Sequence, residues 1–231
     1  MVIDQFSFRV HNVSNCSYST TRVSGVNFMP AKRRVKARKQ PLQHRSRETV
    51  AVILEAAARV LEARGLEGYN TNAVAERGGI SVGSVYQYFP NKDALTLALI
   101  ARFEDELLEK VRDAFAASEG KSLTAALKLL VRAQIEVHAA RAGLNRILET
   151  EEDRLRPTSS DSSASGELKA LVRALLERHR SEIGKPVDGD AIEDVIVISR
   201  AMVDHALQKD LSRAAASRRV LRAIEGYLHR P

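Results

Sequence analysis

The chain contains only one cysteine, Cys16, and no tryptophan among its 231 residues. A single cysteine excludes a disulfide within the chain and any metal site built from several cysteines. We therefore expect a reducing, cytoplasmic setting. Glycine-rich phosphate loops are also missing, and we expect neither a cofactor nor a metal.

The chain has no long apolar run either. No run approaches the length of a membrane span, and the first thirty residues lack the apolar core of a secretory signal. These residues show no clear periodicity. We expect residues 1–44 to form a disordered basic arm, and a translation start at Met29 rather than Met1 remains an open alternative.

Acidic residues are scarce at the N-terminus. Residues 1–47 hold ten Lys or Arg against one acidic residue, a net charge of +9, so the remainder carries −2 of the overall +7. Charge concentrated in this way favours binding to a polyanion through counterion release, and such an arm can enter a minor groove. The alternative is an unstructured tail that keeps the chain soluble.

Alternating apolar segments, which are typical of strands, are missing from residue 46 onward, and helical periodicity replaces them. An apolar stripe ended by Gly65 predicts a first helix, and Asn91 is expected to cap a long one. The polar stretch 156–163 is interpreted as a mobile surface loop. The fold class is therefore all-α, with a DNA-binding domain at 45–92 and a helical domain at 93–231.

Residues 71–92 predict two short helices joined by a glycine turn. Thr71 suits the N-cap of the first helix, Gly79 suits its C-terminal turn, and Ser81 suits the next N-cap. Four-residue spacing directs the apolar side chains of the second helix into a core. The residues that face outward are Val82, Gly83, Ser84, Tyr86, Gln87 and Tyr88.

These outward residues are unusual for a solvated helix, which normally carries Glu, Lys or Ala. They suit contacts with phosphates and base edges. Lys92 lies in the first turn of the following helix, where the macrodipole disfavours a cation unless an anion compensates it. The alternative is that the two tyrosines pack on neighbouring helices and that Lys92 is simply solvated.

The pattern Thr71-x-x-x-Ala75, followed by Gly79-Ile80-Ser81-x-Gly83-x-x-Tyr86-x-Tyr88-Phe89-x-x-Lys92-x-x-Leu95, resembles the DNA-binding domain of TetR/AcrR-type bacterial transcriptional regulators. The resemblance covers residues 47–100 and implies a three-helix domain, with a helix-turn-helix, followed by a larger helical domain for ligand binding and dimerisation. Gly78 stands where that family usually has alanine. Val82 has no hydrogen-bonding group, so any base contact there is apolar.

The resemblance places Ser81, Val82, Gly83 and Ser84 near bases, and it implies phosphate contacts at Thr71, Tyr86, Tyr88 and Lys92. The full set of predicted DNA-binding residues is Arg45, Arg47, Thr71, Ser81, Val82, Gly83, Ser84, Tyr86, Gln87, Tyr88 and Lys92.

The last two predicted helices suggest association. One of them, around residues 192–203, is apolar around most of its circumference, which a small domain cannot bury alone. The other offers the small residues 214–216, which allow close approach. We expect a homodimer through a four-helix bundle of these helices, and a monomer with ordinary core helices is the alternative.

The predicted function is that of a sequence-specific transcriptional regulator, a repressor released from an inverted-repeat operator in double-stranded DNA by a small-molecule effector. A mostly apolar effector pocket is expected from Phe103, Leu107, Leu130, Gln134, His138, Ile147 and Leu175, although the same residues fit an ordinary core. The alternative is an architectural or accessory DNA-binding protein without an effector. An enzyme is not expected, because the spacing of His138, His179, His205, Asp204, Ser199 and Glu136 supports no catalytic or metal site.

Overall fold

The computed structural model describes residues 39–155 and 163–229, with side chains from residue 46 onward. The predictions for the arm and for most of the polar loop lie outside these residues. The described parts contain helices and no strand, which confirms the all-α prediction. None of the described helices has the combined length and apolar character that a bilayer crossing demands.

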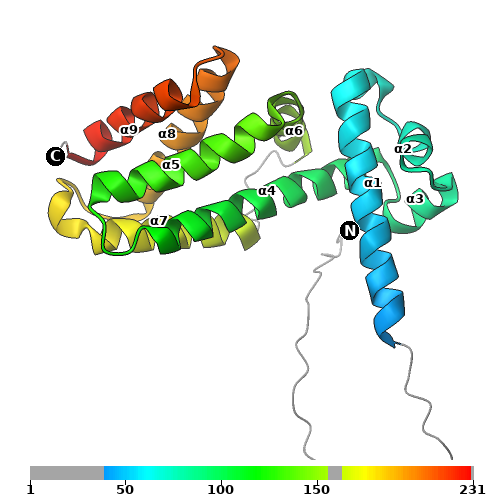
Figure 1. Cartoon of the computed structure of the whole chain (residues 1–231), viewed down its shortest axis with the longest axis horizontal. Coiled ribbons are helices and arrows are strands. Elements are labelled where there is room, and N and C mark those ends of the chain that lie inside the picture. Colours follow the sequence, from blue (N-terminus) through cyan, green and yellow to red (C-terminus); the bar gives the residue numbers. More distant parts are fainter. Residues whose placement is uncertain (1–38, 156–162, 230–231) are drawn as a thin grey trace, which may run out of the picture. The chain divides into compact units, whose positions relative to one another are not determined.

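The first four helices, seen in Figure 1, are α1 (Lys39–Gly68), α2 (Thr71–Gly78), α3 (Val82–Tyr88) and α4 (Lys92–Ala117). Gly65 has a φ of 61° and interrupts α1, as its place after the apolar stripe predicts. The helix begins at Lys39, inside the segment 1–44 for which a basic arm is expected, and the rest of that segment lies outside the described residues.

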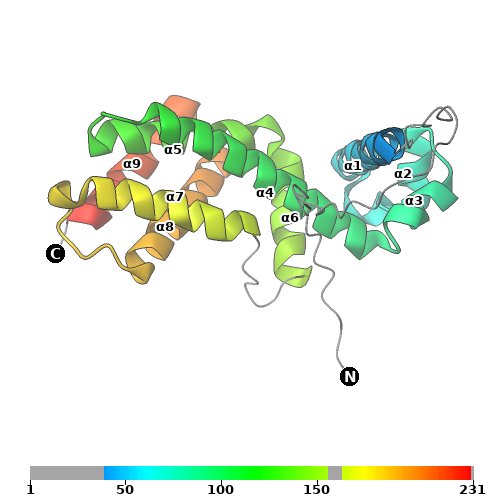
Figure 2. The ribbon, with the colours of Figure 1, turned by 90° about the horizontal axis from the view of Figure 1, so that it is seen from below.

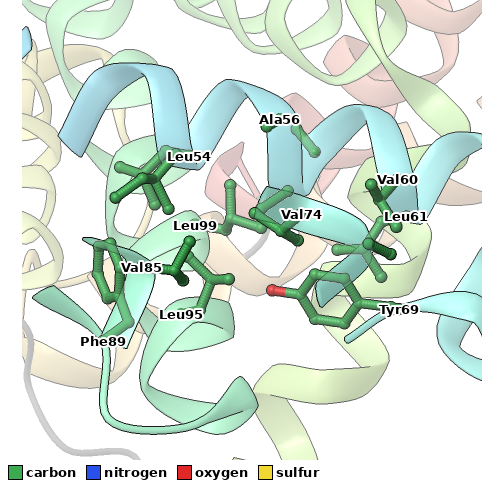
Figure 3. Close-up of a cluster of buried hydrophobic side chains, with 14 of the residues drawn as sticks. Leu54, Ala56, Val60, Leu61, Tyr69, Val74, Val85, Phe89, Leu95 and Leu99 are labelled. Carbon is green, nitrogen blue, oxygen red and sulfur yellow. The ribbon is translucent and has the colours of Figure 1, made fainter. Parts of the chain in front are cut away.

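The buried apolar side chains of α1 to α4 form one cluster. Figure 3 shows Leu54 and Leu61 of α1 facing Val74 of α2, Val85 of α3 and Leu95 of α4. Ile53, Leu61, Val74, Val85 and Leu95 have no exposed surface at all. Burying such a side chain contributes about 1.5–3 kcal/mol, so this cluster fixes where the short helix α3 lies.

The remaining helices are α5 (Leu123–Ala140), α6 (Ala142–Leu155), α7 (Ser163–Arg178), α8 (Gly189–Gln208) and α9 (Arg213–His229), with a 3-10 turn at Arg180–Glu182. Helix α4 packs along α5, α6 and α7, and α8 packs along α9; Figure 2 gives a second view of these helices. Residues of α5 and α7 to α9 form a second apolar cluster.

Helix α6 belongs to the first cluster rather than the second. Its Leu144 and Leu148 are about 4% exposed and pack with the cores of α1 to α4. Three ion pairs add to this contact: Arg141, just before α6, binds Glu55 and Glu62 of α1 at 3.2 and 2.5 Å, and Arg154 binds Asp93 of α4 at 2.6 Å. Both ends of α6 are thus tied to the helix-turn-helix unit.

Candidate nucleic-acid interface

The turn between α2 and α3 follows the predicted chemistry. Gly79 adopts the left-handed conformation, with φ 63° and ψ 32°, and caps α2, while the Ser81 side chain accepts a hydrogen bond from the backbone N–H of Ser84 and caps α3. An L-residue pays roughly 1–2 kcal/mol in the left-handed region, which explains glycine at this position. The sharp turn sets α3 beside α2.

The prediction that Thr71 caps α2 is wrong. The N-cap is Asn70, whose Oδ1 accepts from the N–H of Ala73 at 2.9 Å. Asn and Thr are both good caps, and the rest of the fold decides which of two neighbours has the extended backbone of a cap. Thr71 is instead buried, at 9% exposure, and its hydroxyl donates to the Tyr86 hydroxyl at 3.1 Å.

The Thr71–Tyr86 bond has a clear role in the geometry of α3. Tyr86 is 51% exposed, so its ring stands in solvent while its hydroxyl is held by a buried partner on α2. A held phenol loses little further freedom on binding a ligand. Its oxygen can accept from Thr71 and still donate its proton to a phosphate.

The solvent face of α3 carries few groups that the fold needs. Ser81, Val82, Gly83 and Gln87 are exposed, and Ser84 is half-buried with its Oγ 2.8 Å from Ser81 Oγ. Gly83 has ordinary negative φ, and a Cβ there would have only Ser81 Oγ near it, at 3.8 Å. Neither the backbone conformation nor a neighbouring side chain therefore requires glycine.

Tyr88 differs from the other predicted contacts on α3. Its side chain is half-buried and packs against the apolar cluster of α1 to α4. Tyr88 therefore packs on neighbouring helices in part, as the alternative to a DNA contact predicts. The exposure of Tyr86 argues against such packing for that residue. Amphipathic rings can present the hydroxyl to solvent while their carbons are covered.

The N-terminus of α4 brings a cation beside α3. Asn91 caps the helix, its Oδ1 accepting from the N–H of Ala94 at 2.8 Å, and Lys92 follows as the first helical residue. The Thr96 hydroxyl donates to the carbonyl of Lys92 at 3.0 Å. Next to Lys92, the hydrogen bond from Arg154 lowers the pKa of Asp93 below its ordinary value.

Tyr69 is buried near the N-terminus of α4. It is 2% exposed and lies with its hydroxyl 3.5 Å from the Thr96 hydroxyl. Burial raises its pKa to about 12, so the phenol stays neutral at physiological pH. Of the two predicted arginines on α1, Arg47 is exposed, and the side chain of Arg45 lies outside the described residues.

The residues predicted to line an effector pocket are distributed over two cavities. The larger, of about 410 Å³, is lined by Phe103, Leu107, Gln134 and His138 from that set. The smaller, of about 60 Å³, is lined by Leu107, Leu130, Gln134 and Leu175. Ile147 lines neither and packs on the first apolar cluster.

The structure brings together a polar cluster of His138 and Asp204, for which the sequence spacing supports no site, with Glu149, which the sequence analysis does not single out. His138 of α5 lies with its Nδ1 3.1 Å from Asp204 of α8 and 3.7 Å from Glu149 of α6. Burial, together with the nearby Asp204 charge, raises the pKa of Glu149. The three residues are far apart in sequence, so no spacing rule could find them. Of the other histidines considered, His179 pairs with Glu182 at 2.6 Å and His205 is exposed.

Comparison with known proteins agrees with this geometry. Residues 53–99 match the family model described as "Bacterial regulatory proteins, tetR family". The chain is 27% identical over 172 residues to the nucleoid occlusion factor SlmA of Escherichia coli O1:K1 / APEC, covering 72% of this chain and 82% of that protein.

Two solved structures share the fold. A TetR family transcription regulator from Marinobacter aquaeolei VT8 has a TM-score of 0.61 at 20% identity, covering 80% of this chain and 98% of that one. The regulator FadR from Bacillus subtilis, solved in complex with stearoyl-CoA, has a TM-score of 0.62 at 18% identity, covering 78% and 99%.

Proposed function

We propose that this chain, which belongs to the tetR family of bacterial regulatory proteins, is a homodimeric repressor that binds an inverted-repeat operator in double-stranded DNA and leaves it when a small molecule binds. Helix α3 enters the major groove, where Val82, Gly83 and Ser84 contact base edges. Lys92 and the hydroxyl of Tyr86 hold phosphates on either side.

The observation that carries the DNA-binding assignment is the bare surface at Gly83. Glycine is a poorer helix former than alanine, and here, in the first turn of α3, no positive φ or crowded neighbour requires it. Its flanking residue Val82 is 36% exposed and apolar. The surface at Gly83 and Val82 lacks bulky side chains, although glycine destabilises the helix, and it therefore allows another molecule to approach closely. The edges of DNA bases, including thymine methyl groups, would fit such a surface.

Dimerisation would give two copies of α3 the spacing of successive major grooves. Val197 of α8 is 53% exposed and Ile198 beside it is half-buried, while Ile196 and Val197 also border the cavity of about 410 Å³. On α9, Ala214 is exposed as well. Apolar and small residues on two adjacent helices support a bundle with the same helices of a second copy.

The effector site is assigned to the cavity of about 410 Å³, a size typical of small-molecule sites. FadR from Bacillus subtilis binds stearoyl-CoA, which supports an apolar ligand body here too. The charges around this cavity favour a neutral or cationic ligand, however. Five acidic side chains line it against two basic ones: Glu104, Glu149, Glu152, Asp153 and Glu193 against Lys169 and Arg200.

The substitution Gly83→Ala tests the assignment of α3. Alanine stabilises the helix, so the melting temperature should stay the same or rise, while the added methyl group weakens operator binding at least about tenfold. Gly143→Ala is the matched control, because Gly143 is also helical with open space around its Cα. Unchanged operator affinity in Gly83→Ala would remove α3 from the interface.

The second candidate is an accessory DNA-binding protein without an effector, which the similarity to SlmA favours. Footprinting distinguishes the two. A regulator protects one short inverted repeat near a promoter, and a ligand abolishes the protection. An accessory protein would protect sites irrespective of promoters, and no small molecule would change the pattern.

A further inference from the structure

We propose that His138, Glu149 and Asp204 form a binding site for a first-row divalent transition-metal ion, with Zn²⁺ as the best fit. His138 lies on α5, Glu149 on α6 and Asp204 on α8, so the site joins three helices. One ligand atom of each residue lies within 4.8 Å of the other two. His138 and Glu149 also line the cavity of about 410 Å³, but the inference requires neither the operator nor the effector proposed above.

The spacing of the donor atoms is close to that of an occupied site. Bonds of 2.0–2.2 Å in a tetrahedral Zn²⁺ complex separate the ligand atoms by about 3.4 Å. His138 Nδ1 is 3.1 Å from Asp204 and 3.7 Å from Glu149, which brackets that value. The third separation, between the carboxylate oxygens of Glu149 and Asp204, is at most 4.8 Å, and rotation of these two side chains would bring it toward the same value.

The donor types define the class of ion. One imidazole nitrogen and two carboxylate oxygens suit Zn²⁺, Mn²⁺ or Ni²⁺ better than Ca²⁺ or Mg²⁺, which prefer oxygen ligands alone. Three protein ligands leave the fourth position of a tetrahedral ion for water or another small ligand. Charge also favours a cation, because the two ionised carboxylates carry −2, which the nearby Arg200 offsets only in part.

His138 is the most deeply buried member of this group. It is 3% exposed, its Nδ1 is directed at both carboxylates, and its Nε2 has no hydrogen-bond partner among the described residues. Binding an ion through Nδ1 would fix the proton on Nε2 and so give the ring one defined tautomer.

The site has a route for an ion and support from its surroundings. Glu149 and Asp204 keep 24% and 20% of their side chains exposed, and a small hollow lined by Asn145, Arg146 and Gln208 adjoins them. The Asn145 amide donates to the carbonyl of His138 at 3.0 Å, which holds the end of α5 against α6. This bond keeps the imidazole in place when the ion is absent.

His179 supplies an internal comparison. It is 6% exposed and lies 2.6 Å from Glu182, so it is a buried histidine with one carboxylate neighbour. It belongs to no group of three possible ligands among the described residues. If a buried His–carboxylate contact alone bound metal, His179 would bind it as well.

The test is metal binding by the full chain after treatment with a chelator. Titration calorimetry with Zn²⁺, and absorption spectra with Co²⁺ in its place, should show one ion bound at this site per chain. Glu149→Gln and Asp204→Asn should each weaken the binding at least about 100-fold, since each removes a direct ligand. His179→Gln is the matched control and should leave the affinity unchanged.

Thermal melting keeps the proposal testable if a variant is poorly folded. At a Zn²⁺ concentration of about 100 times Kd, the melting temperature of the wild-type chain should rise by about 5–10 °C, and that of folded Glu149→Gln should not. The proposal is overturned if the wild-type chain binds no ion, or if folded Glu149→Gln and Asp204→Asn bind Zn²⁺ as tightly as the wild type.

Discussion

Two kinds of residue meet on the face of α3 and the start of α4. Lys92 offers a charge with no sequence information, whereas Ser84 offers a hydroxyl beside the exposed Val82 and Gly83. Phosphate contacts hold the protein on any DNA, and base-edge contacts distinguish one sequence from another. Replacing Lys92 and replacing Ser84 should therefore change DNA affinity in different ways.

Lys92→Ala should weaken binding to operator and random DNA alike, and should reduce the slope of log affinity against log salt by about 1 unit, because one phosphate contact is lost. Ser84→Ala should lower operator affinity by about 1–3 kcal/mol and leave random DNA unaffected. Fluorescence anisotropy at three salt concentrations measures both. An equal loss on both kinds of DNA for Ser84→Ala would contradict its role at base edges.

The ion pair between Glu62 and Arg141 predicts that the stability of the fold depends on pH. The hydrogen bonds from Arg141 lower the pKa of Glu62 below its ordinary value of 4.5. A lowered pKa means that the pair stabilises the fold above pH 4.5 and that this contribution is lost as pH falls through the folded-state pKa. Screening at this half-exposed pair keeps the effect small.

Arg141→Gln should accordingly lower the melting temperature at pH 7 and have progressively less effect as the pH approaches 3. Arg112→Gln is a control for a surface pair, since Arg112 binds the half-exposed Glu167, and it should have a smaller effect at pH 7. Melting curves across this pH range decide the point. A difference between Arg141→Gln and wild type that grows toward acid would refute the assignment.

At the scale of elements, α6 contacts both the first apolar cluster and polar residues of α5 and α8. Its Leu144 and Leu148 pack with α1 to α4, while Glu149 faces His138 of α5 and Asp204 of α8. Helix α4 offers one route for a ligand signal, because it carries Lys92 at its start and Phe103 and Leu107 at the cavity, and α6 offers a second route. A movement of α6 would pull on Asp93, next to Lys92, through Arg154.

Arg154→Gln should therefore reduce the coupling between effector and operator more than it reduces either binding alone. Coupling between two sites is reciprocal and typically amounts to 1–3 kcal/mol, so calorimetry of the effector with and without operator DNA measures it. Arg180→Gln, which breaks an exposed pair with Glu177, is the control. Unchanged coupling in Arg154→Gln would leave α4 as the only route.

The elements that sequence predicted well are those set by local chemistry. Ser81, Asn91 and Gly79 have the capping and turn roles expected of them, because these depend on neighbours three or four residues away. Thr71 was assigned the cap that Asn70 makes, since two adjacent caps of similar strength differ only in tertiary context. Long-range contacts such as that of His138 with Asp204 had no local signal at all.

At the scale of the whole molecule, a DNA-binding unit is followed by a helical unit with a cavity of about 410 Å³. The central claim is that two copies of α3 contact DNA together. A two-fold symmetric protein that reads major grooves requires a two-fold symmetric site, with half-sites about 10 base pairs apart or a multiple of that spacing.

Selection of bound sequences from random DNA, using the full chain, tests this claim most directly. The account predicts enrichment of one inverted repeat with that spacing, lost in Gly83→Ala and retained in the Gly143→Ala control. Enrichment of sites without two-fold symmetry, or of no sequence at all, would contradict it.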